Sequence, residues 1–379
     1  MSQEITKTDA IIVGGGLAGL SSAIHLAKGK FNVLVIEKNS YPRHKVCGEY
    51  ISNEVLPYLE YLDIDVFKLG AVKIDTFKLS TVNNNAITAN LPLGGFGISR
   101  YCIDNALVEK AKQVGVTFRQ ELVEDIKFRN DEFIVSTKHH ERYKSKIVIG
   151  AFGKRSNLDI ILNRQFIKSK SPYLAVKTHV KGEFPENVVA LHNFEGGYCG
   201  VSKVEDNTIN LCYITNYKSF KKHKNIGEFQ KKVLFKNYEL DRIFKETTPV
   251  FEKSLTISQI SFEPKNAIEN HIIMCGDSAA LIHPLCGNGM SMAIRSSQMA
   301  SELIIKFLQN EISSRKELET EYLKKWNDTF KSRLKTGQLV DKLFNYSKLT
   351  EIGISMIKWL PFILPYIIKR THGKPIRIE

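Results

Sequence analysis

Tryptophan is scarce in this sequence, and paired-cysteine motifs and an apolar leader are missing. Two of the 379 residues are Trp, and none of the six cysteines belongs to a CxxC pair. A zinc or iron–sulfur site is therefore not expected, and no other metal site is predicted. The first ten residues are polar, so no signal peptide is expected. These features together predict a cytoplasmic protein with free thiols.

Positive charge is in excess, but it is not gathered into a nucleic-acid-binding motif. Lys and Arg outnumber Asp and Glu by 54 to 40, which gives a formal net charge of +14. Because no recognisable nucleic-acid motif accompanies that charge, a nucleic-acid partner is not predicted. An anionic ligand, a membrane surface and an ordinary solvated basic surface all remain open.

Residues 9–38 read as a strand–helix–strand unit with a glycine-rich turn. Two short apolar, β-branched runs predict buried parallel strands, and a helical pattern lies between them. In the pattern Gly14-x-Gly16-x-x-Gly19, the first glycine permits the tight turn and the second lets the backbone approach a pyrophosphate. Gly19 lets the helix pack closely on the strand. Glu37 ends the second strand at the spacing of an acid that accepts hydrogen bonds from a ribose. The unit predicts dinucleotide binding, and it does not distinguish FAD from NAD.

A second glycine-rich turn near residue 280 favours FAD. A predicted strand ends at Gly276-Asp277, a short turn follows to Pro284, and residues 287–290 open a long amphipathic helix. Gly276 permits close approach of the backbone to a ligand, and Asp277 can accept hydrogen bonds from ribityl hydroxyls. The backbone N–H groups at the start of the helix can face the edge of an isoalloxazine ring, where negative charge develops on reduction.

With these motifs, the chain resembles the FAD-dependent monooxygenases of the para-hydroxybenzoate hydroxylase fold. Geranylgeranyl reductases and flavin-dependent halogenases are relatives of that fold. The resemblance covers roughly residues 8–310 and rests on GxGxxG…E, on the arginine of ISRYCIDNAL and on GDxAxxxxPxxGxG. It implies that Arg100 reaches the FAD pyrophosphate or ribose and that Val123 lies beside the adenine.

The segment PRHKVCGEYIS, residues 42–52, resembles the PRxKxCG motif of the reductases, and its GE resembles that of the halogenases. In this interpretation Arg43 and Lys45 neutralise phosphate or lie near the ribityl region, and Gly48 permits close backbone approach. Cys47 then lies near the ring, either as a catalytic group or as a small buried apolar residue.

The predicted site therefore has one large cofactor set and two catalytic candidates. The catalytic candidates are Cys47 and Tyr198. The cofactor set draws on all the motifs above: Gly14, Gly16, Leu17, Ala18, Gly19, Glu37, Lys38, Arg43, Cys47, Gly48, Arg100, Val123, Gly276, Asp277, Pro284, Gly287, Asn288, Gly289 and Met290.

The sequence departs from the resembled families at three places. Phe152 stands where hydroxylases carry the acid of GADG, which puts their mode of NADH or NADPH docking in doubt. The halogenase WxWxIP motif is absent, so chlorination is not expected. In residues 196–206 the reductases' YxWxFP motif keeps Tyr198 and loses its Trp and Pro. Because no second GxGxxG follows a strand, NADH or NADPH is expected to visit the flavin transiently, or a partner is expected to reduce it.

The predicted fold class is α/β, with a Rossmann-type FAD-binding domain, an antiparallel substrate sheet and a C-terminal helical region. The predicted boundaries are 1–72, 97–165 and 268–310 for the FAD-binding domain, 73–96 and 172–264 for the substrate domain, and 311–379 for the helical region.

The tail, residues 352–375, is apolar but is interrupted by Lys358, Pro361 and Pro365. A spanning helix needs about 20 apolar residues, and these interruptions argue against one. The tail therefore predicts an apolar cap over a lipophilic substrate tunnel, a peripheral membrane contact, or a helix pair packed on the core.

Three functions follow from the resemblance and the residues. The first is a monooxygenase that hydroxylates an apolar, polyketide- or isoprenoid-like molecule through a flavin C4a-hydroperoxide. The second is a geranylgeranyl reductase-like enzyme that delivers hydride from flavin N5 to a C=C bond. The third is a non-catalytic flavin- or lipid-binding protein. The altered YxWxFP motif favours the first function, whereas Phe152 and the PRxKxCG motif favour the second.

Overall fold

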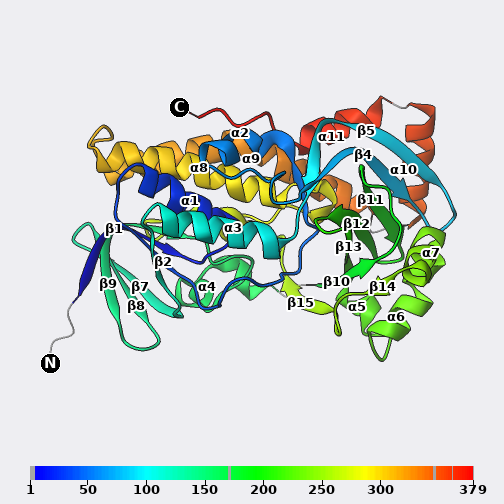
Figure 1. Ribbon diagram of the computed structural model, residues 1–379, viewed down its shortest axis with the longest axis horizontal. Helices are drawn as coiled ribbons and strands as arrows, with labels where there is room; N and C mark the ends of the chain where they lie inside the picture. Colours follow the sequence, from blue (N-terminus) through cyan, green and yellow to red (C-terminus); the bar gives the residue numbers. More distant parts are fainter. Residues whose placement is uncertain (1–4, 170–171, 345–346, 361, 379) are drawn as a thin grey trace.

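The computed structural model describes residues 5–169, 172–344, 347–360 and 362–378. The side chains of Pro284 and of residues 342–349 lie outside that description, as does the whole of Pro361. Two β-sheets lie side by side along the long axis, and the long helices run over one side of them (Figure 1). The site described below lies where the two sheets meet.

The first sheet contains the glycine-rich unit. Its order is β16-β17-β9-β1-β2-β6, and β1 pairs in parallel with both β2 and β9. All four residues of β2 are buried, as expected for a β-branched strand in the middle of a parallel sheet. Its strands are β1 (Thr6–Val13), β2 (Val33–Ile36), β6 (Thr117–Arg119), β9 (Arg142–Gly150), β16 (Ile268–Glu269) and β17 (Ile272–Met274), with β7 (Val123–Arg129) and β8 (Glu132–Thr137) joined to β9 through β8.

The second sheet is mainly antiparallel and has the order β14-β10-β13-β12-β11-β4-β5-β3, with β15 paired to β10 along the same edge as β14. Strands β4 and β11 pair in parallel, and this pairing joins two parts of the sheet that are far apart in the sequence. Its strands are β3 (Tyr50–Ser52), β4 (Val72–Ser80), β5 (Ala86–Gly97), β10 (Tyr173–Lys181), β11 (Val188–Phe194), β12 (Gly197–Val204), β13 (Thr208–Asn216), β14 (Thr248–Pro249) and β15 (Leu255–Ile260).

The segment 217–246 differs from the strands expected throughout 172–264. It forms short helices that pack on the second sheet (Figure 1). The reason is local, because Asn216, Asn225 and Asn237 each accept a backbone N–H with the side chain and so begin a helix. The helices are α5 (Tyr217–Phe220), α6 (Ile226–Lys232) and α7 (Tyr238–Glu246).

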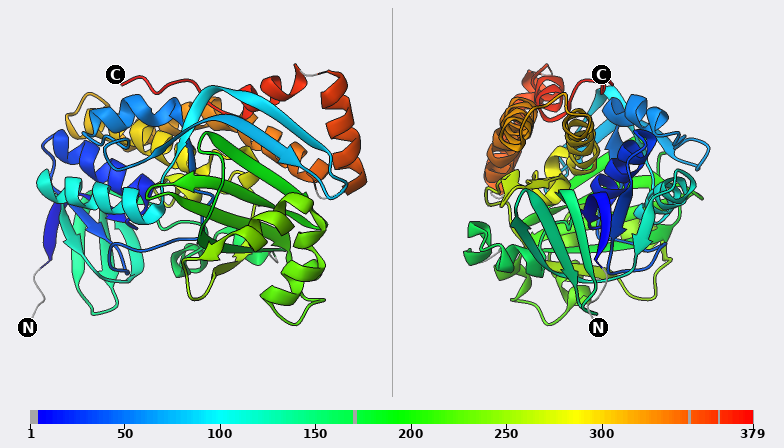
Figure 2. Two further views of the ribbon diagram at one scale, coloured as in Figure 1. Left: turned by 45° about the vertical axis from the view of Figure 1, so that its right-hand side comes forward. Right: turned by 90° about the vertical axis from the view of Figure 1, so that its left-hand side faces the viewer.

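The remaining helices cover the first sheet and the outer end of the second. The domain boundaries that were predicted from the sequence stay a prediction. Two of the helices, α10 and α11, stand over β4 and β5 at one end of the molecule (Figure 2). The helices are α1 (Leu17–Lys28), α2 (Leu56–Tyr61), α3 (Arg100–Gln113), α4 (Asn157–Ile161), α8 (Gly289–Leu308), α9 (Arg315–Phe344), α10 (Ser347–Trp359) and α11 (Ile363–Thr371).

Candidate functional site

The turn between β1 and α1 leaves no room for side chains on its glycines. Gly14 has a φ of +105°, and a Cβ built there would lie 2.4 Å from the carbonyl oxygen of Ala151. A Cβ on Gly19 would lie 2.0 Å from the carbonyl oxygen of Gly14. The backbone at the start of α1 therefore packs directly against neighbouring backbone carbonyl groups. The first turn of that helix, which includes Leu17, holds no acidic residue. Its free N–H groups can bind a phosphate.

Glu37 fastens this turn to the segment that follows β2. Its carboxylate accepts hydrogen bonds from the Gly15 N–H at 2.8 Å, from the Asn39 side chain at 2.6 Å and from Arg43 at 3.1 Å. Burial alone raises the pKa of Glu37, but these donors outweigh it, and the pKa lies below its ordinary value. Glu37 is therefore a buried anion at the turn, and its predicted contact with a ribose stays a prediction. Lys38 is exposed.

Arg100 lies at the same turn and is held in place by Asp104. Its guanidinium makes two bonds of 2.8 Å to that carboxylate, and Lys45 adds a third contact of 2.6 Å. Burial raises the pKa of Asp104, but the two cations outweigh burial and keep it below its usual range. A Cβ built on Gly16 would lie 3.7 Å from Arg100 Nη2. Two cations on one carboxylate leave net positive charge beside the glycine turn, which suits a pyrophosphate.

The second glycine-rich turn approaches the first from the opposite side. Gly276 lies between α1 and α8. A Cβ built there would lie 3.1 Å from the Cβ of Ala18 in α1 and 3.2 Å from the Cβ of Ala293 in α8. The carbonyl of Asp277 accepts a bond of 2.7 Å from Lys265. Asn288 precedes α8 without a side-chain cap, and its amide donates instead to the carbonyl of Thr371 at 2.8 Å. The first N–H groups of α8 are therefore free of a side-chain cap.

Cys47 and Gly48 complete this arrangement. The Cys47 thiol contacts the sulfur of Met290 at 3.5 Å, and Asn210 donates to the Gly48 carbonyl at 2.9 Å. No atom lies within 4 Å of a Cβ built on Gly48, so the backbone there borders open space. Residues 42–49 thus lie between the start of α8 and the second sheet, and the backbone at Gly48 borders open space that a bound ring could use.

The predicted cofactor residues lie on the elements expected of them. Arg43 pairs with Glu37, and its predicted role beside a phosphate or the ribityl region stays a prediction. Their positions are the β1–α1 turn and first turn of α1 (Gly14, Gly16, Leu17, Ala18, Gly19), the end of β2 (Glu37, Lys38), the 42–52 loop (Arg43, Cys47, Gly48), the start of α3 (Arg100), the start of β7 (Val123), and the segment from η4 (Gly276–Ser278) through η5 (Pro284–Cys286) into α8 (Gly276, Asp277, Pro284, Gly287, Asn288, Gly289, Met290).

A buried charged cluster beside this loop was not identified from the sequence. Glu49 has a left-handed φ of +53° and no exposed side-chain surface. Its carboxylate accepts bonds from Lys177, from His179 at 2.7 Å and from the Arg100 N–H at 2.8 Å. Burial raises the pKa of Glu49, but His179 and Lys177 outweigh burial and lower it. The sequence signal that could have identified it is the alternation of Lys177 and His179 directly after the apolar run of residues 174–176.

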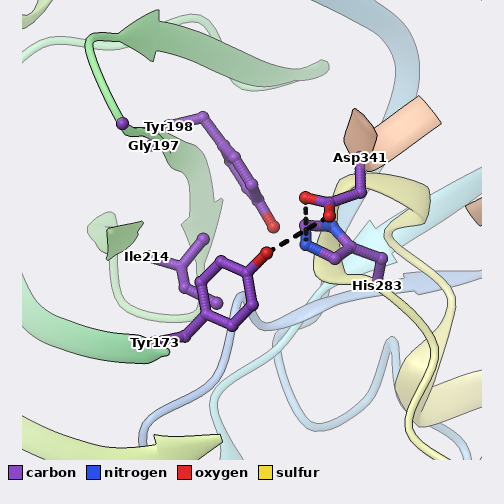
Figure 3. Close-up of a pocket in the computed structure, with 7 residues that line it drawn as sticks. Tyr173, Gly197, Tyr198, Ile214, His283 and Asp341 are labelled. Atoms are coloured by element: carbon purple, nitrogen blue, oxygen red, sulfur yellow. Dashed lines mark hydrogen bonds and ion pairs between the residues drawn. The ribbon is translucent and has the colours of Figure 1, made fainter. Parts of the chain in front are cut away.

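Tyr198 belongs to a second polar cluster, which joins β10, β12, α9 and the segment before η5 (Figure 3). His283 Nε2 lies 2.6 Å from one oxygen of Asp341, and Tyr173 donates to the other oxygen at 3.2 Å. The Tyr198 hydroxyl is buried and has no hydrogen-bond partner among the described residues. It faces a cavity of about 10 Å³, the room of a single water molecule. Burial raises the pKa of Tyr198 well above its ordinary value, so the phenol stays protonated.

An apolar cavity of about 360 Å³ lies beneath α10 and α11. Leu91 of β5, Leu191 of β11 and Leu364 of α11 are among its lining residues. At its inner end it reaches Tyr50 and Gly287, beside the second glycine-rich turn. A volume of this size suits a small organic molecule, and the lining suits an apolar one.

Comparisons with known proteins point to an FAD-dependent oxidoreductase. Residues 9–47 match the family model described as FAD dependent oxidoreductase. An uncharacterized protein of Methanosarcina barkeri is 26% identical over 326 residues, covering 83% of this chain and 79% of that protein. Digeranylgeranylglycerophospholipid reductase 1 of Methanosphaera stadtmanae is 25% identical over 345 residues, covering 85% of this chain and 81% of the reductase.

Among solved structures, a flavin-dependent brominase superposes with a TM-score of 0.78 at 17% identity. The match covers 96% of this chain and 93% of the brominase chain. This likeness shows that both sheets and the C-terminal helices follow the fold of a flavin enzyme.

The Glu49→Gln substitution should strongly destabilise the protein. Removing the carboxylate leaves Lys177 buried without its counter-charge, which costs about 3–5 kcal/mol of unfolding free energy. Chemical denaturation followed by circular dichroism measures the loss. The exposed Glu252→Gln is the matched control and should change stability by less than about 0.5 kcal/mol. A loss below 1 kcal/mol for Glu49→Gln would show that the cluster does not depend on this charge.

Acid should weaken the same contact. The folded pKa of Glu49 lies below its ordinary value of 4.5. The stability it contributes is therefore present above about pH 4.5 and is lost as the pH falls through the lower folded pKa. The unfolding free energy of the wild type should fall more steeply below pH 5 than that of Glu49→Gln. Parallel pH curves for the two proteins would contradict this.

The Asp277→Ala substitution should weaken FAD binding by about 1.5–3 kcal/mol, because a carboxylate hydrogen bond to the ribityl chain is lost. Flavin fluorescence on titration with FAD measures the affinity, and denaturation should release the flavin from the chain. The exposed Asp328→Ala is the control and should bind FAD as the wild type does. Unchanged affinity in Asp277→Ala would remove this residue from the flavin site.

Proposed function

We propose that this chain, a member of the FAD-dependent oxidoreductases, uses its flavin to modify an apolar small molecule held in the cavity beneath α10 and α11. The observation that carries this proposal is the position of the cavity. Its apolar lining ends at Tyr50 and Gly287, next to the turn that the sequence assigns to the isoalloxazine. An apolar substrate would therefore reach the flavin without crossing water.

Bound FAD supplies two-electron chemistry, taking hydride from NADH or NADPH and passing it to oxygen or to the substrate. In monooxygenation, the substrate, O2, NAD(P)H and a proton give hydroxylated substrate, water and NAD(P)+. In reduction, a C=C bond, NAD(P)H and a proton give the saturated bond and NAD(P)+. The chain itself binds and orients the two molecules and excludes water.

Monooxygenation is the first candidate, because the strand that carries Tyr198 lacks the Trp and Pro of the reductase motif. Reduction is the second candidate, and two observations favour it. Residues 42–48 keep the PRxKxCG pattern. In addition, a relative named as a digeranylgeranylglycerophospholipid reductase is similar over most of its length. Both reactions need a proton to be moved beside the flavin.

Tyr198 is proposed to move that proton. Its buried, protonated hydroxyl lies in the same cluster as His283, whose ring centroid is 6.0 Å from that of Tyr198. His283 in turn contacts Asp341, which can orient the ring. Because the Tyr198 hydroxyl has no partner among the described residues, a proton passes between it and His283 through a water molecule in the small cavity that both residues line. Cys47, against Met290, is proposed to shape the space beside the ring.

The product mass should identify the reaction. The holoenzyme is reduced with dithionite without oxygen and mixed with geranylgeraniol or a long-chain alkylphenol, and oxygen is then admitted to half of the sample. A gain of one oxygen atom only after oxygen enters identifies a monooxygenase. A gain of two hydrogen atoms before oxygen enters identifies a reductase. Flavin reoxidation with neither product would favour a non-catalytic flavin- or lipid-binding protein.

The Tyr198→Phe substitution should lower the substrate-dependent turnover of the reduced enzyme by about 10²–10⁴-fold, because the proton donor is lost. The rate of flavin reduction should stay within twofold of wild type. Stopped-flow absorbance of the flavin measures both steps. Tyr213→Phe is the control, since Tyr213 is a buried tyrosine on neighbouring β13 that packs in a different apolar cluster. Equal turnover in the two variants would exclude Tyr198 from the chemistry.

A further inference from the structure

The bend between α10 and α11 exposes large apolar side chains to solvent. Trp359 is 89% exposed and Phe362 is 68% exposed, which is unusual for side chains of this size. The exposed members, which we call the C-terminal apolar tip, are Ile352, Met356, Trp359, Leu360, Phe362 and Tyr366.

The opposite face of the same helices is apolar as well. Ile354, Leu364 and Ile368 are buried and line the cavity. Apolar side chains thus lie on both the buried and the exposed sides of this helix pair, and an exposed apolar patch of this kind is typical of a surface that protein or lipid covers. Ile352 and Met356 belong to the tip and also line the cavity. Apolar surface therefore continues from the tip to the inner end of the cavity.

The charges around the tip are mostly positive. Residues 350–378 contain one acid, Glu351, and its carboxylate accepts a bond of 2.7 Å from Asn85. The guanidinium of Arg370 lies 4.8 Å from the ring centroid of Tyr366. The cations of the two helices are Lys358 in the last turn of α10 and Lys369 and Arg370 in the last turn of α11. Lys374 and Arg377 follow on the segment that returns to Glu54 and α8. Such a border complements the anionic headgroups of a lipid bilayer.

The geometry of the pair suits a shallow contact. Among the described residues no single helix is long and apolar enough to cross a membrane, and α10 and α11 are bent by 116° relative to each other. A bent pair with an apolar corner and basic flanks can enter the headgroup region without spanning the bilayer.

We propose that the C-terminal apolar tip docks on an anionic lipid bilayer, and that the cavity takes up its substrate from that bilayer. The docking follows from the tip and its charges, whereas the uptake rests on the proposed function. Trp359 and Phe362 enter the bilayer first, the basic side chains bind the headgroups, and Ile352 and Met356 border the route inward.

The test uses the FAD-loaded full-length protein and vesicles of phosphatidylcholine, with or without phosphatidylglycerol. The two tryptophans make fluorescence specific, because Trp326 is only 7% exposed whereas Trp359 is 89% exposed. Vesicles with phosphatidylglycerol should shift the emission to the blue and co-sediment the protein. Vesicles of phosphatidylcholine alone should bind at least tenfold more weakly.

Three variants separate the contributions. The double variant Trp359→Ser, Phe362→Ser should lower the vesicle partition coefficient at least tenfold, with unchanged FAD content and circular dichroism. Lys369→Gln with Arg370→Gln should remove most of the preference for phosphatidylglycerol. The control Ile160→Ser with Tyr238→Ser changes residues that are 59% and 58% exposed elsewhere, and it should bind vesicles as the wild type does.

Several outcomes would overturn the proposal. They are a lack of binding to either vesicle, an equal loss in the control variant, and a dimer in light scattering that the Trp359→Ser, Phe362→Ser change abolishes. The dimer would show that a second copy of the chain covers the tip. If the protein converts detergent-dispersed substrate but does not bind vesicles, only the docking proposal is rejected. If it binds vesicles but shows no turnover, only the proposed function is rejected.

Discussion

The buried carboxylate of Glu49 connects the two halves of the site. Its own segment runs beside the predicted flavin position, its partners Lys177 and His179 belong to the second sheet, and the Arg100 N–H begins α3. Buried charges of this kind are expensive unless every partner is in place. The left-handed backbone at Glu49 persists because these three contacts over-determine its position. These contacts tie the segment before β3 to β10 and to the start of α3 through one carboxylate.

How much of the site could be predicted depends on how local its parts are. The turn with Gly14 and Gly19 was predictable, because steric demands within one strand–helix connection select glycine at both positions. The strand before Glu37 was predictable from its short apolar run and ends at Ile36, whereas the strand expected to end at Gly276-Asp277 already ends at Met274. The helices of 217–246 were not, since short helices begun by single asparagines carry almost no periodic signal.

The polar clusters could not be predicted, because their members are far apart in the sequence. Glu49 and Lys177 are separated by 128 residues, and no local pattern announces that they meet. Tyr198 was selected because it is the tyrosine of the YxWxFP motif. Asp341 belongs to the same cluster, but it lies on a charged helix and matches no motif. Such pairs depend on the packing of whole elements, which composition and spacing do not determine.

The bond from the Asn288 side chain to the carbonyl of Thr371 joins the flavin turn to the end of the helix that roofs the cavity. The segment after that helix is tied down again, where the Ile376 N–H donates to the carbonyl of Glu54 at 2.8 Å. If a ligand that orders the turn also orders the roof through this bond, thermodynamic reciprocity requires that a molecule in the cavity raises the affinity for the flavin by the same factor. The affinity for the cofactor and the affinity for a molecule in the cavity would then both depend on the same coupling free energy.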